Sequence, residues 1–224
     1  MTQVAQVQYP RYGTGQAGHS SFTRDVIARL MTLGLGFVPA QLFTAHLARE
    51  TGWGQYVWNG NFGNIKAYSG WTGPTYVLTD RLGYTDNYRS YNDATQGLAD
   101  DVALIRDHAR YAGAWQQLQS GDPNWYSTLG IEGYFEGPSD PNQPGVHQPT
   151  TADNVGPAQD EYNQVLALVQ QYVPSAPIGA VVMNLLPRFL TAGFLGLAAF
   201  ATYKVWQDGD LKIPGLPQPK KLRR

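Results

Sequence analysis

Residues 45–54 read AHLARETGWG, and the pattern of the chain changes within this stretch. Before it, apolar residues recur at helical spacing after Pro39, which stands where a helix tolerates proline, and Gly52 is a typical helix stop. After it, glycines alternate with aromatic and β-branched residues as far as Tyr91. The pattern predicts a helix over 40–51, followed by short antiparallel strands and loops.

Apolar stripes predict four further helices around this centre. Three of them cover residues 21–33, 113–119 and 157–173. The fourth begins at Asn92 or Asp93, and its expected inward residues are Leu98, Val102, Ile105 and Ala109. The first 20 residues are polar and glycine-rich, which predicts a flexible N-terminal arm. We therefore expect an α+β domain over residues 21–173 that is mostly α, with a small antiparallel β lobe.

Glu50 is the residue in the central stretch whose position points to chemistry. It follows Leu47 by three residues and so continues the apolar face of its helix. Partial burial and the negative end of the helix dipole both raise the pKa of a carboxyl group at this place, and Trp53 can supply an apolar wall. Such an environment suits a general acid. The alternative is a surface glutamate paired with Arg49 or His46.

Residues 48–54, ARETGWG, resemble the catalytic signature of lysozyme-like peptidoglycan hydrolases. The similarity is to the glucosaminidase group, which includes flagellar muramidase-type enzymes and phage lysins. Residues 61–67, NFGNIKA, resemble a second element of that group, with Asn64 as an extra residue. GWTGP at 70–74, YRSY at 88–91 and GLAD at 97–100 follow in the order that the family uses. The resemblance covers about residues 22–172.

The resemblance implies a lysozyme-like fold that binds glycan strands between its lobes and cleaves a β-1,4 bond between N-acetylglucosamine and N-acetylmuramic acid. Glu50 would be the catalytic acid. A lytic transglycosylase that gives anhydromuramic products is the alternative. Asp80 follows a threonine at the place of the family's second acidic residue, although its side chain is shorter, and it could equally be a turn residue.

Tyr134, within GYFEG at 133–137, resembles a family motif near the site. It would orient a sugar N-acetyl group or stabilise the transition state, or else form an aromatic wall. Glu132 and Glu136 beside it are weaker candidates for the acid. No cofactor is expected, because the four histidines lack the spacing of metal ligands and no phosphate-binding glycine loop with lysine is present.

Aromatic and basic residues of the strand-rich part are the candidates for substrate binding. Aromatic faces suit the C–H surfaces of sugars, and basic groups suit the carboxylates of peptidoglycan. The candidates are Trp53, Asn61, Phe62, Lys66, Tyr68, Trp71 and Arg89. About half of the clustered aromatic residues, which include Trp58 and Tyr76, are expected in the core. Arg89 has the alternative of pairing with Asp80 or Glu50.

The C-terminal part differs from the rest in charge and hydropathy. Residues 174–224 hold seven basic and two acidic residues, against a net charge of −1 for the whole chain. The stretch 178–203 has Arg188 as its single charge, and Tyr203 and Trp206 suit a membrane interface. We expect a linker at 174–184, a transmembrane helix at 185–206 and a basic tail at 207–224. A buried helix of a soluble protein is the alternative.

Partners and location follow from these features as expectations. The first residues do not have the pattern of a signal peptide, and the balanced charge argues against nucleic-acid binding. A lytic enzyme of a bacteriophage, anchored in the virion membrane and contacting capsid or other virion proteins, fits this architecture. The host inner membrane, with the catalytic domain on the wall side, is the other location. An inactive wall-binding virion protein and a membrane-perturbing protein are the competing functions.

Overall fold

A computed structural model describes residues 2–9, 12–68, 70–79, 85–134 and 152–173, all within the first of the chain's two units, Met1–Pro174. The elements in chain order are α1 (Gly15–Thr32), α2 (Phe37–Thr51), β1 (Thr75–Thr79), β2 (Thr85–Arg89), α3 (Ala94–Asp107), a 3-10 turn η1 (Ala109–Tyr111), α4 (Ala112–Ser120), α5 (Trp125–Ile131) and α6 (Ala152–Tyr172). The predicted mostly helical α+β class with a small antiparallel sheet is confirmed.

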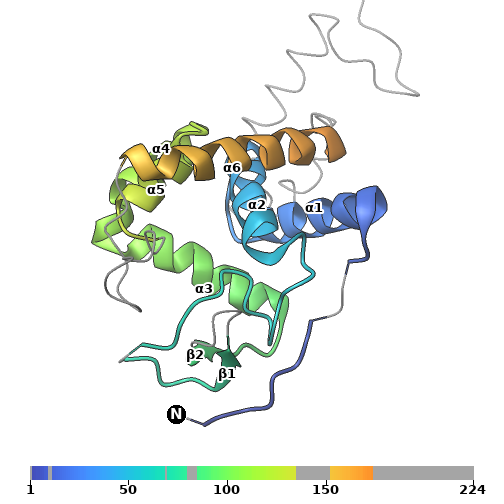
Figure 1. Ribbon diagram of the computed structural model, residues 1–224, viewed down its shortest axis with the longest axis vertical. Helices are drawn as coiled ribbons and strands as arrows, with labels where there is room; N and C mark the ends of the chain where they lie inside the picture. The colour runs from blue at the N-terminus through green and yellow to red at the C-terminus, as the bar shows by residue number, and fades with distance from the viewer. Residues whose placement is uncertain (1, 10–11, 69, 80–84, 135–151, 174–224) are drawn as a thin grey trace, which may run out of the picture. The chain divides into compact units, whose positions relative to one another are not determined.

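Helix α2 lies at the centre of the helical part. It packs against α1, α4 and α6, and α6 crosses it (Figure 1). Its central residues are buried almost without interruption, from Pro39 to Ala48. The ring of Phe43 stacks on Trp125 of α5 with 5.7 Å between the ring centroids. This surrounded position fixes the C-terminal end of α2, where Glu50 lies.

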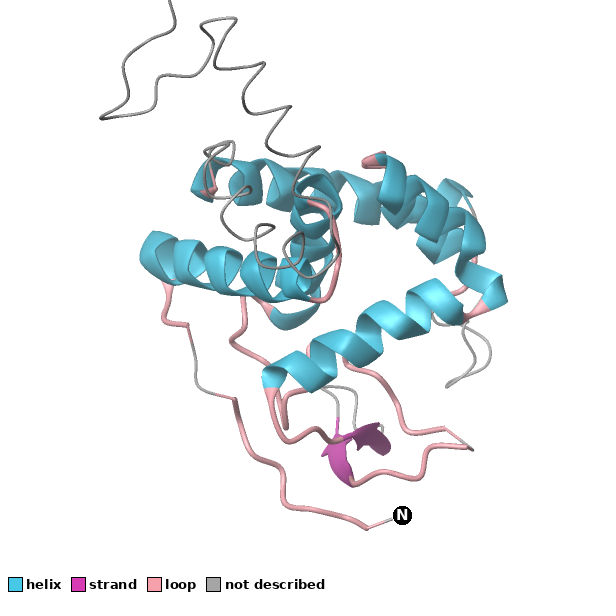
Figure 2. Cartoon of the chain, turned by 180° about the vertical axis from the view of Figure 1, so that it is seen from behind, coloured by secondary structure: helices cyan, strands magenta, loops and turns pink. Residues whose placement is uncertain are grey.

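The sheet consists of β1 and β2, which pair antiparallel and place Tyr76 opposite Tyr88. The two strands lie on the α3 side of the helices (Figure 2). Tyr76 is fully buried, as expected for about half of the aromatic residues in this region. Helix α3 begins next to this part of the chain. The Asp93 carboxylate caps it by accepting from the backbone N–H groups of Thr95 and Gln96, as predicted for residue 92 or 93.

Three helix predictions need correction. Helix α1 begins at Gly15 rather than near residue 21, and α6 begins at Ala152, so that Pro157 lies inside it. Helix α3 ends at Asp107, which leaves Ala109 exposed in the 3-10 turn instead of inward. Helix α5 was not predicted, because its seven residues are too few to show a period. Its apolar residues nevertheless belong to the main core.

The N-terminal segment also differs from the predicted flexible arm. Residues 2–9 bond to the strand-rich part through their backbone: Val4 N–H donates to the Thr75 carbonyl at 2.7 Å, and Tyr9 N–H donates to the Val57 carbonyl at 2.8 Å. The ring of Tyr9 packs edge-on against Phe62. Polar, glycine-rich composition does not reveal such contacts, because they depend on backbone groups of residues more than 45 positions away.

The predicted membrane span at 185–206, its linker and its basic tail lie outside the described residues. Among the residues that are described, no helix combines the length and the apolar character needed to cross a membrane.

Candidate active site

The end of α2 is a tight reversal of the chain that fixes the position of Glu50. Gly52 adopts a left-handed conformation with φ 56°, which glycine reaches without a steric penalty, and Trp53 follows with φ 60°. The Thr51 hydroxyl accepts from the Gly54 N–H at 2.9 Å and so holds the reversal together. Glu50 therefore lies in the last turn of a buried helix, with its side chain 22% exposed.

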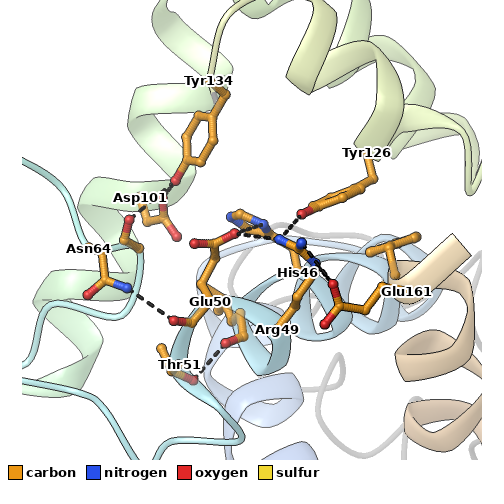
Figure 3. A network of polar contacts seen from close by, with 12 residues as sticks. His46, Arg49, Glu50, Thr51, Asn64, Asp101, Tyr126, Tyr134 and Glu161 are labelled. Atoms are coloured by element: carbon orange, nitrogen blue, oxygen red, sulfur yellow. Dashed lines mark hydrogen bonds and ion pairs between the residues drawn. The ribbon is translucent and has the colours of Figure 1, made fainter. Parts of the chain in front are cut away.

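Two basic side chains of the same helix face the Glu50 carboxyl group (Figure 3). Its Oε1 lies 3.6 Å from Arg49 Nη1 and 4.0 Å from His46 Nδ1. Burial raises the pKa of Glu50 above its ordinary value, and this effect outweighs the opposing influence of the Arg49 charge. The carboxyl group thus keeps its proton to a higher pH than a surface glutamate, while remaining open to solvent.

Arg49 is bound on its far side by residues of α5 and α6. Its Nη2 lies 2.9 Å from Glu161 Oε2, and its Nη1 donates to the Tyr126 hydroxyl at 2.8 Å. These contacts satisfy much of the guanidinium away from Glu50. The sequence alternative of a simple Arg49–Glu50 pair therefore describes only part of the geometry.

His46 forms the floor of the site and is uncharged. Its ring is fully buried, and neither ring nitrogen has a hydrogen-bond partner among the described residues. Burial, with the nearby Arg49 charge, lowers the pKa of His46 to about 3. At neutral pH the imidazole therefore does not form a charged pair with Glu50, which removes the second sequence alternative for that residue.

Asn64 ties the following loop to the end of α2. Its Nδ2 donates to the backbone carbonyl of Glu50 at 3.1 Å, and its own backbone has φ 49°. The last carbonyls of a helix lack intrahelical partners, so this bond satisfies one of them. Asn64 thus positions the backbone of Glu50. The sequence did not indicate this role, because Asn64 stood out there only as an extra residue.

Tyr134 lies on the other side of the Glu50 carboxyl group. Its hydroxyl lies 3.2 Å from Asp101 Oδ1 of α3 and 3.5 Å from the Gly63 carbonyl. Its ring packs edge-on against His46 with centroids 5.3 Å apart. The structure therefore brings the sequence candidates Glu50 and Tyr134 together (Figure 3). Asp101, which was not a sequence candidate, lies between them in this view.

Several predicted substrate contacts have structural roles instead. Phe62 is fully buried in the core. Asn61 is fully buried as well, and its side-chain amide forms hydrogen bonds with backbone groups of Ile65 and Arg89. Buried side chains present no surface to a glycan. These two assignments are corrected: Asn61 and Phe62 hold the loop that carries Asn64.

The two basic candidates are paired with carboxylates of the strand-rich part. Lys66 Nζ lies 2.9 Å from Asp86 Oδ2, and Arg89 Nη1 donates to Asp100 Oδ2 at 2.7 Å. Arg89 also lies over the Trp71 ring, 4.8 Å from its centroid. Among the described residues, Arg89 therefore pairs with Asp100 and not with Glu50; the other predicted partner, Asp80, lies outside the described residues.

The remaining aromatic candidates differ in accessibility. Trp53 stacks on His19 with centroids 4.3 Å apart, whereas Tyr68 is 64% exposed.

Asp80 and Glu136 lie outside the described residues. Glu132 accepts from two N–H groups in the first turn of α4, those of Gly113 and Ala114, and therefore caps this helix rather than serving as an acid of this site. Within the described ranges, no three acidic or histidine side chains are grouped as metal ligands.

The arrangement is suited to proton donation. A partly exposed carboxyl group with a raised pKa stands above an apolar, uncharged floor, and a phenol lies close to it. Such surroundings favour the protonated carboxyl group, which can transfer its proton to a leaving oxygen.

Comparison with known proteins finds partial similarities. No family model matches the chain. Peptidoglycan hydrolase FlgJ of Vibrio parahaemolyticus is 37% identical over 97 residues, which cover 37% of this chain and 31% of that protein. Solved structures with partial similarity include a peptidoglycan hydrolase from Sphingomonas sp. A1 (TM-score 0.48, 21% identity, 72% of this chain and 97% of that chain). The glycoside hydrolase domain of Salmonella typhimurium FlgJ is another (TM-score 0.48, 20% identity, 68% of this chain and 98% of that chain). The chain thus spans less than a third of the curated relative that it matches, and it is similar to that part of a peptidoglycan hydrolase.

Proposed function

We propose that this chain is a peptidoglycan hydrolase of the glycosidase type, with Glu50 as its general acid. The observation that carries the proposal is the Glu50 carboxyl group, which is partly exposed and has a raised pKa at the end of a buried helix. The sequence similarity to a protein named as a peptidoglycan hydrolase supports the substrate class. The proposed bond is the β-1,4 link between N-acetylglucosamine and N-acetylmuramic acid.

In the proposed reaction, Glu50 donates its proton to the glycosidic oxygen as the bond to the anomeric carbon breaks. The neutral His46 leaves this proton in place, because an imidazole with a pKa of about 3 is a weaker base than the carboxylate. The bonds from Arg49 to Glu161 and Tyr126 keep part of the guanidinium directed away from Glu50. Both features favour the acid form of Glu50.

The positive charge that develops on the sugar needs a second group, a water molecule or the substrate itself. Asp80 and Tyr134 are the two candidates that we propose for this role. Of these two, the structure describes Tyr134, and its side chain lies near Glu50. Asp101 does not qualify, since its carboxyl group is fully buried and cannot reach a sugar. Attack by the C6 hydroxyl of the muramic residue would give an anhydro product, so the lytic transglycosylase reaction is the second candidate.

The test is the rate at which purified murein is cleared by the protein and by Glu50→Gln. The amide is nearly isosteric but cannot donate the proton, and we expect a loss of about 10²–10⁴-fold. Asp107→Asn, an exposed change on α3, is the control for loss of one negative charge and should clear murein normally. Clearing by Glu50→Gln within about threefold of the parent protein, with unchanged circular dichroism, would refute the role of Glu50.

For the C-terminal part, we propose that residues 185–206 anchor the protein in a membrane, in a phage virion or at the host inner membrane. The support is the sequence alone: one charge, Arg188, in the stretch 178–203. Flotation with liposomes tests this. The full chain should float, and Leu195→Arg should not, because an arginine at the centre of a span costs about 2.5–3.5 kcal/mol. A parent chain that stays with the soluble fraction would contradict the anchor.

A further inference from the structure

Asp101 is a buried carboxyl group that the proposed reaction does not use. It lies on the inner face of α3 and is fully buried. Its Oδ1 lies 3.2 Å from the Tyr134 hydroxyl, while its Oδ2 has no hydrogen-bond partner among the described residues. A buried carboxylate oxygen without a partner is costly, and such a group calls for an explanation.

The surroundings of Asp101 are closely packed and direct the carboxyl group toward the site. A side-chain carbon added at Gly63 would overlap the Asp101 carboxyl group, so the glycine allows the loop and α3 to approach each other. The Asp101 carboxyl group points to the gap between the Tyr134 phenol and the Glu50 carboxyl group (Figure 3). Loop, helix and phenol together hold Asp101 in this one place.

We propose that Asp101 is a positioning residue: it fixes the Tyr134 phenol beside Glu50, and its ionisation is electrostatically coupled to that of the Glu50 carboxyl group. The proposal rests on the proposed function of Glu50. Asp101 does not contact the substrate, because it is fully buried, and it acts through its two neighbours.

The electrostatics follow from the charges that surround the pair. The pKa of Asp101 is raised to about 7, mainly by burial; the hydrogen bond from Tyr134 opposes this rise, and the negative charges of Glu50 and Asp100 add to it. Tyr134 faces Asp101 as a neutral phenol, since burial and both carboxyl groups raise its pKa. Two carboxyl groups in one low-dielectric site do not both ionise readily, so the last proton is retained to a higher pH than either group alone would keep it.

The groups that face Glu50 from other directions set the remaining balance. They are Arg49 and the uncharged His46 on α2, the Tyr126 phenol on α5 and Glu161 on α6. Arg49 is the one cation among these groups and favours ionised Glu50, whereas Glu161 opposes it. A negative charge on Asp101 acts in the same sense as Glu161, and so helps Glu50 to remain an acid.

The protonation state of Asp101 also sets the direction of its hydrogen bond with Tyr134. A protonated Asp101 can donate to the phenol oxygen, which leaves the phenol hydrogen for the Gly63 carbonyl at 3.5 Å. An ionised Asp101 instead accepts from the phenol at 3.2 Å. In both states the phenol oxygen stays in place near Glu50, because one of its bonds to Asp101 is always made.

The test compares the pH dependence of kcat/KM on murein fragments for the parent protein and Asp101→Asn. The amide keeps a partner for Tyr134 but cannot ionise. Without the anionic neighbour the pKa of Glu50 falls, and we expect the alkaline limb of the profile to move down by about one pH unit. Asp107→Asn, an exposed carboxylate of the same helix, is the matched control and should leave the profile unchanged.

A second readout records the carboxyl groups directly. Carbon-13 NMR of side-chain carboxyl groups should show Glu50 and Asp101 titrating in two coupled steps in the parent protein, and a single lower step for Glu50 in Asp101→Asn. An unchanged profile together with an unchanged Glu50 titration in Asp101→Asn would overturn the positioning role. If instead Glu50→Gln remained active, the proposed function itself would fail, and the two failures are therefore distinguishable.

Discussion

The guanidinium of Arg49 is bonded to Glu161, with 2.9 Å between Nη2 and Oε2, although Glu50 is its neighbour in sequence. The distance from Arg49 to the Glu50 carboxyl group is longer, at 3.6 Å. A residue of α6 thus competes with the proposed acid for the nearest positive charge. The competition favours the protonated form of Glu50, because a free guanidinium would stabilise the carboxylate.

Glu161→Gln should therefore reduce the fraction of Glu50 that is protonated near neutral pH. Removal of this negative charge lowers the pKa of Glu50 directly, and Arg49 is released to pair with the Glu50 carboxylate. We expect the alkaline limb of the kcat/KM profile to fall by about half a pH unit or more. Asp160→Asn, an exposed neighbour on the same helix, is the control. A profile equal to that of the parent protein would show that Arg49 is not in balance between the two glutamates.

His46 should make the protein sensitive to acid. Its pKa is about 3 in the folded chain and 6.5 ordinarily, so the unfolded chain binds the extra proton, and stability is lost as the pH falls below about 6.5. Between pH 6.5 and 4.5, the free energy of unfolding of His46→Leu should fall by about 2–3 kcal/mol less than that of the parent protein, at about 1.4 kcal/mol for each pH unit. Urea unfolding at both pH values measures this.

The exposed His108→Leu is the control for that experiment, and it should follow the parent protein. Equal losses in the parent protein and in His46→Leu would mean that the His46 ring takes up its proton without unfolding, which would contradict its burial as an uncharged group.

Asp101 should have the opposite effect on stability. Its pKa is raised from 3.8 to about 7 in the folded chain, so its contribution to stability is largest at low pH and is lost as the pH rises between these values. Asp101→Asn cannot ionise. Relative to the parent protein it should gain stability from pH 4 to pH 7, by roughly 4 kcal/mol at most. A difference that does not change with pH would show that Asp101 ionises freely in the folded protein.

The contact between Gly97 and Gly60 should tolerate no side chain. A Cβ atom at Gly97 would overlap the Gly60 carbonyl oxygen, where α3 meets the loop after α2. We expect Gly97→Ala to destabilise the protein by about 1–3 kcal/mol despite the better helix propensity of alanine. Gly156→Ala in α6 is the matched control, because a Cβ atom there meets nothing, and it should be neutral or stabilising by up to about 1 kcal/mol. Equal urea midpoints for both variants would contradict the close packing at Gly97.

The sequence was sufficient for the local features of the site. The apolar face of α2 places Glu50 beside buried residues, and the raised pKa follows from that position. The same argument would have identified Asp101, which stands three residues after the buried Leu98 and four before the buried Ile105. Asp101 was nevertheless not among the sequence candidates, and neither was the preceding Asp100, which binds Arg89.

Pairings between distant parts of the chain were beyond the sequence. The partner of Lys66 is Asp86 across the loop region, and the bond from Asn64 to the Glu50 carbonyl depends on how the loop returns to α2. The path of residues 2–9 along the strand-rich part rests on backbone bonds, which no side-chain pattern records. Such contacts follow from the tertiary fold and not from local periodicity.

Mass spectrometry of murein digested by the parent protein and by Glu50→Gln tests the central claim most directly. We expect the parent protein to release muropeptides cut at β-1,4 bonds, and the variant to release about 10²–10⁴-fold less in the same time. A hydrolysed end identifies hydrolysis, and a product lighter by one water identifies the transglycosylase reaction. Equal release by both proteins, or no glycan fragments from the parent protein, would contradict the account.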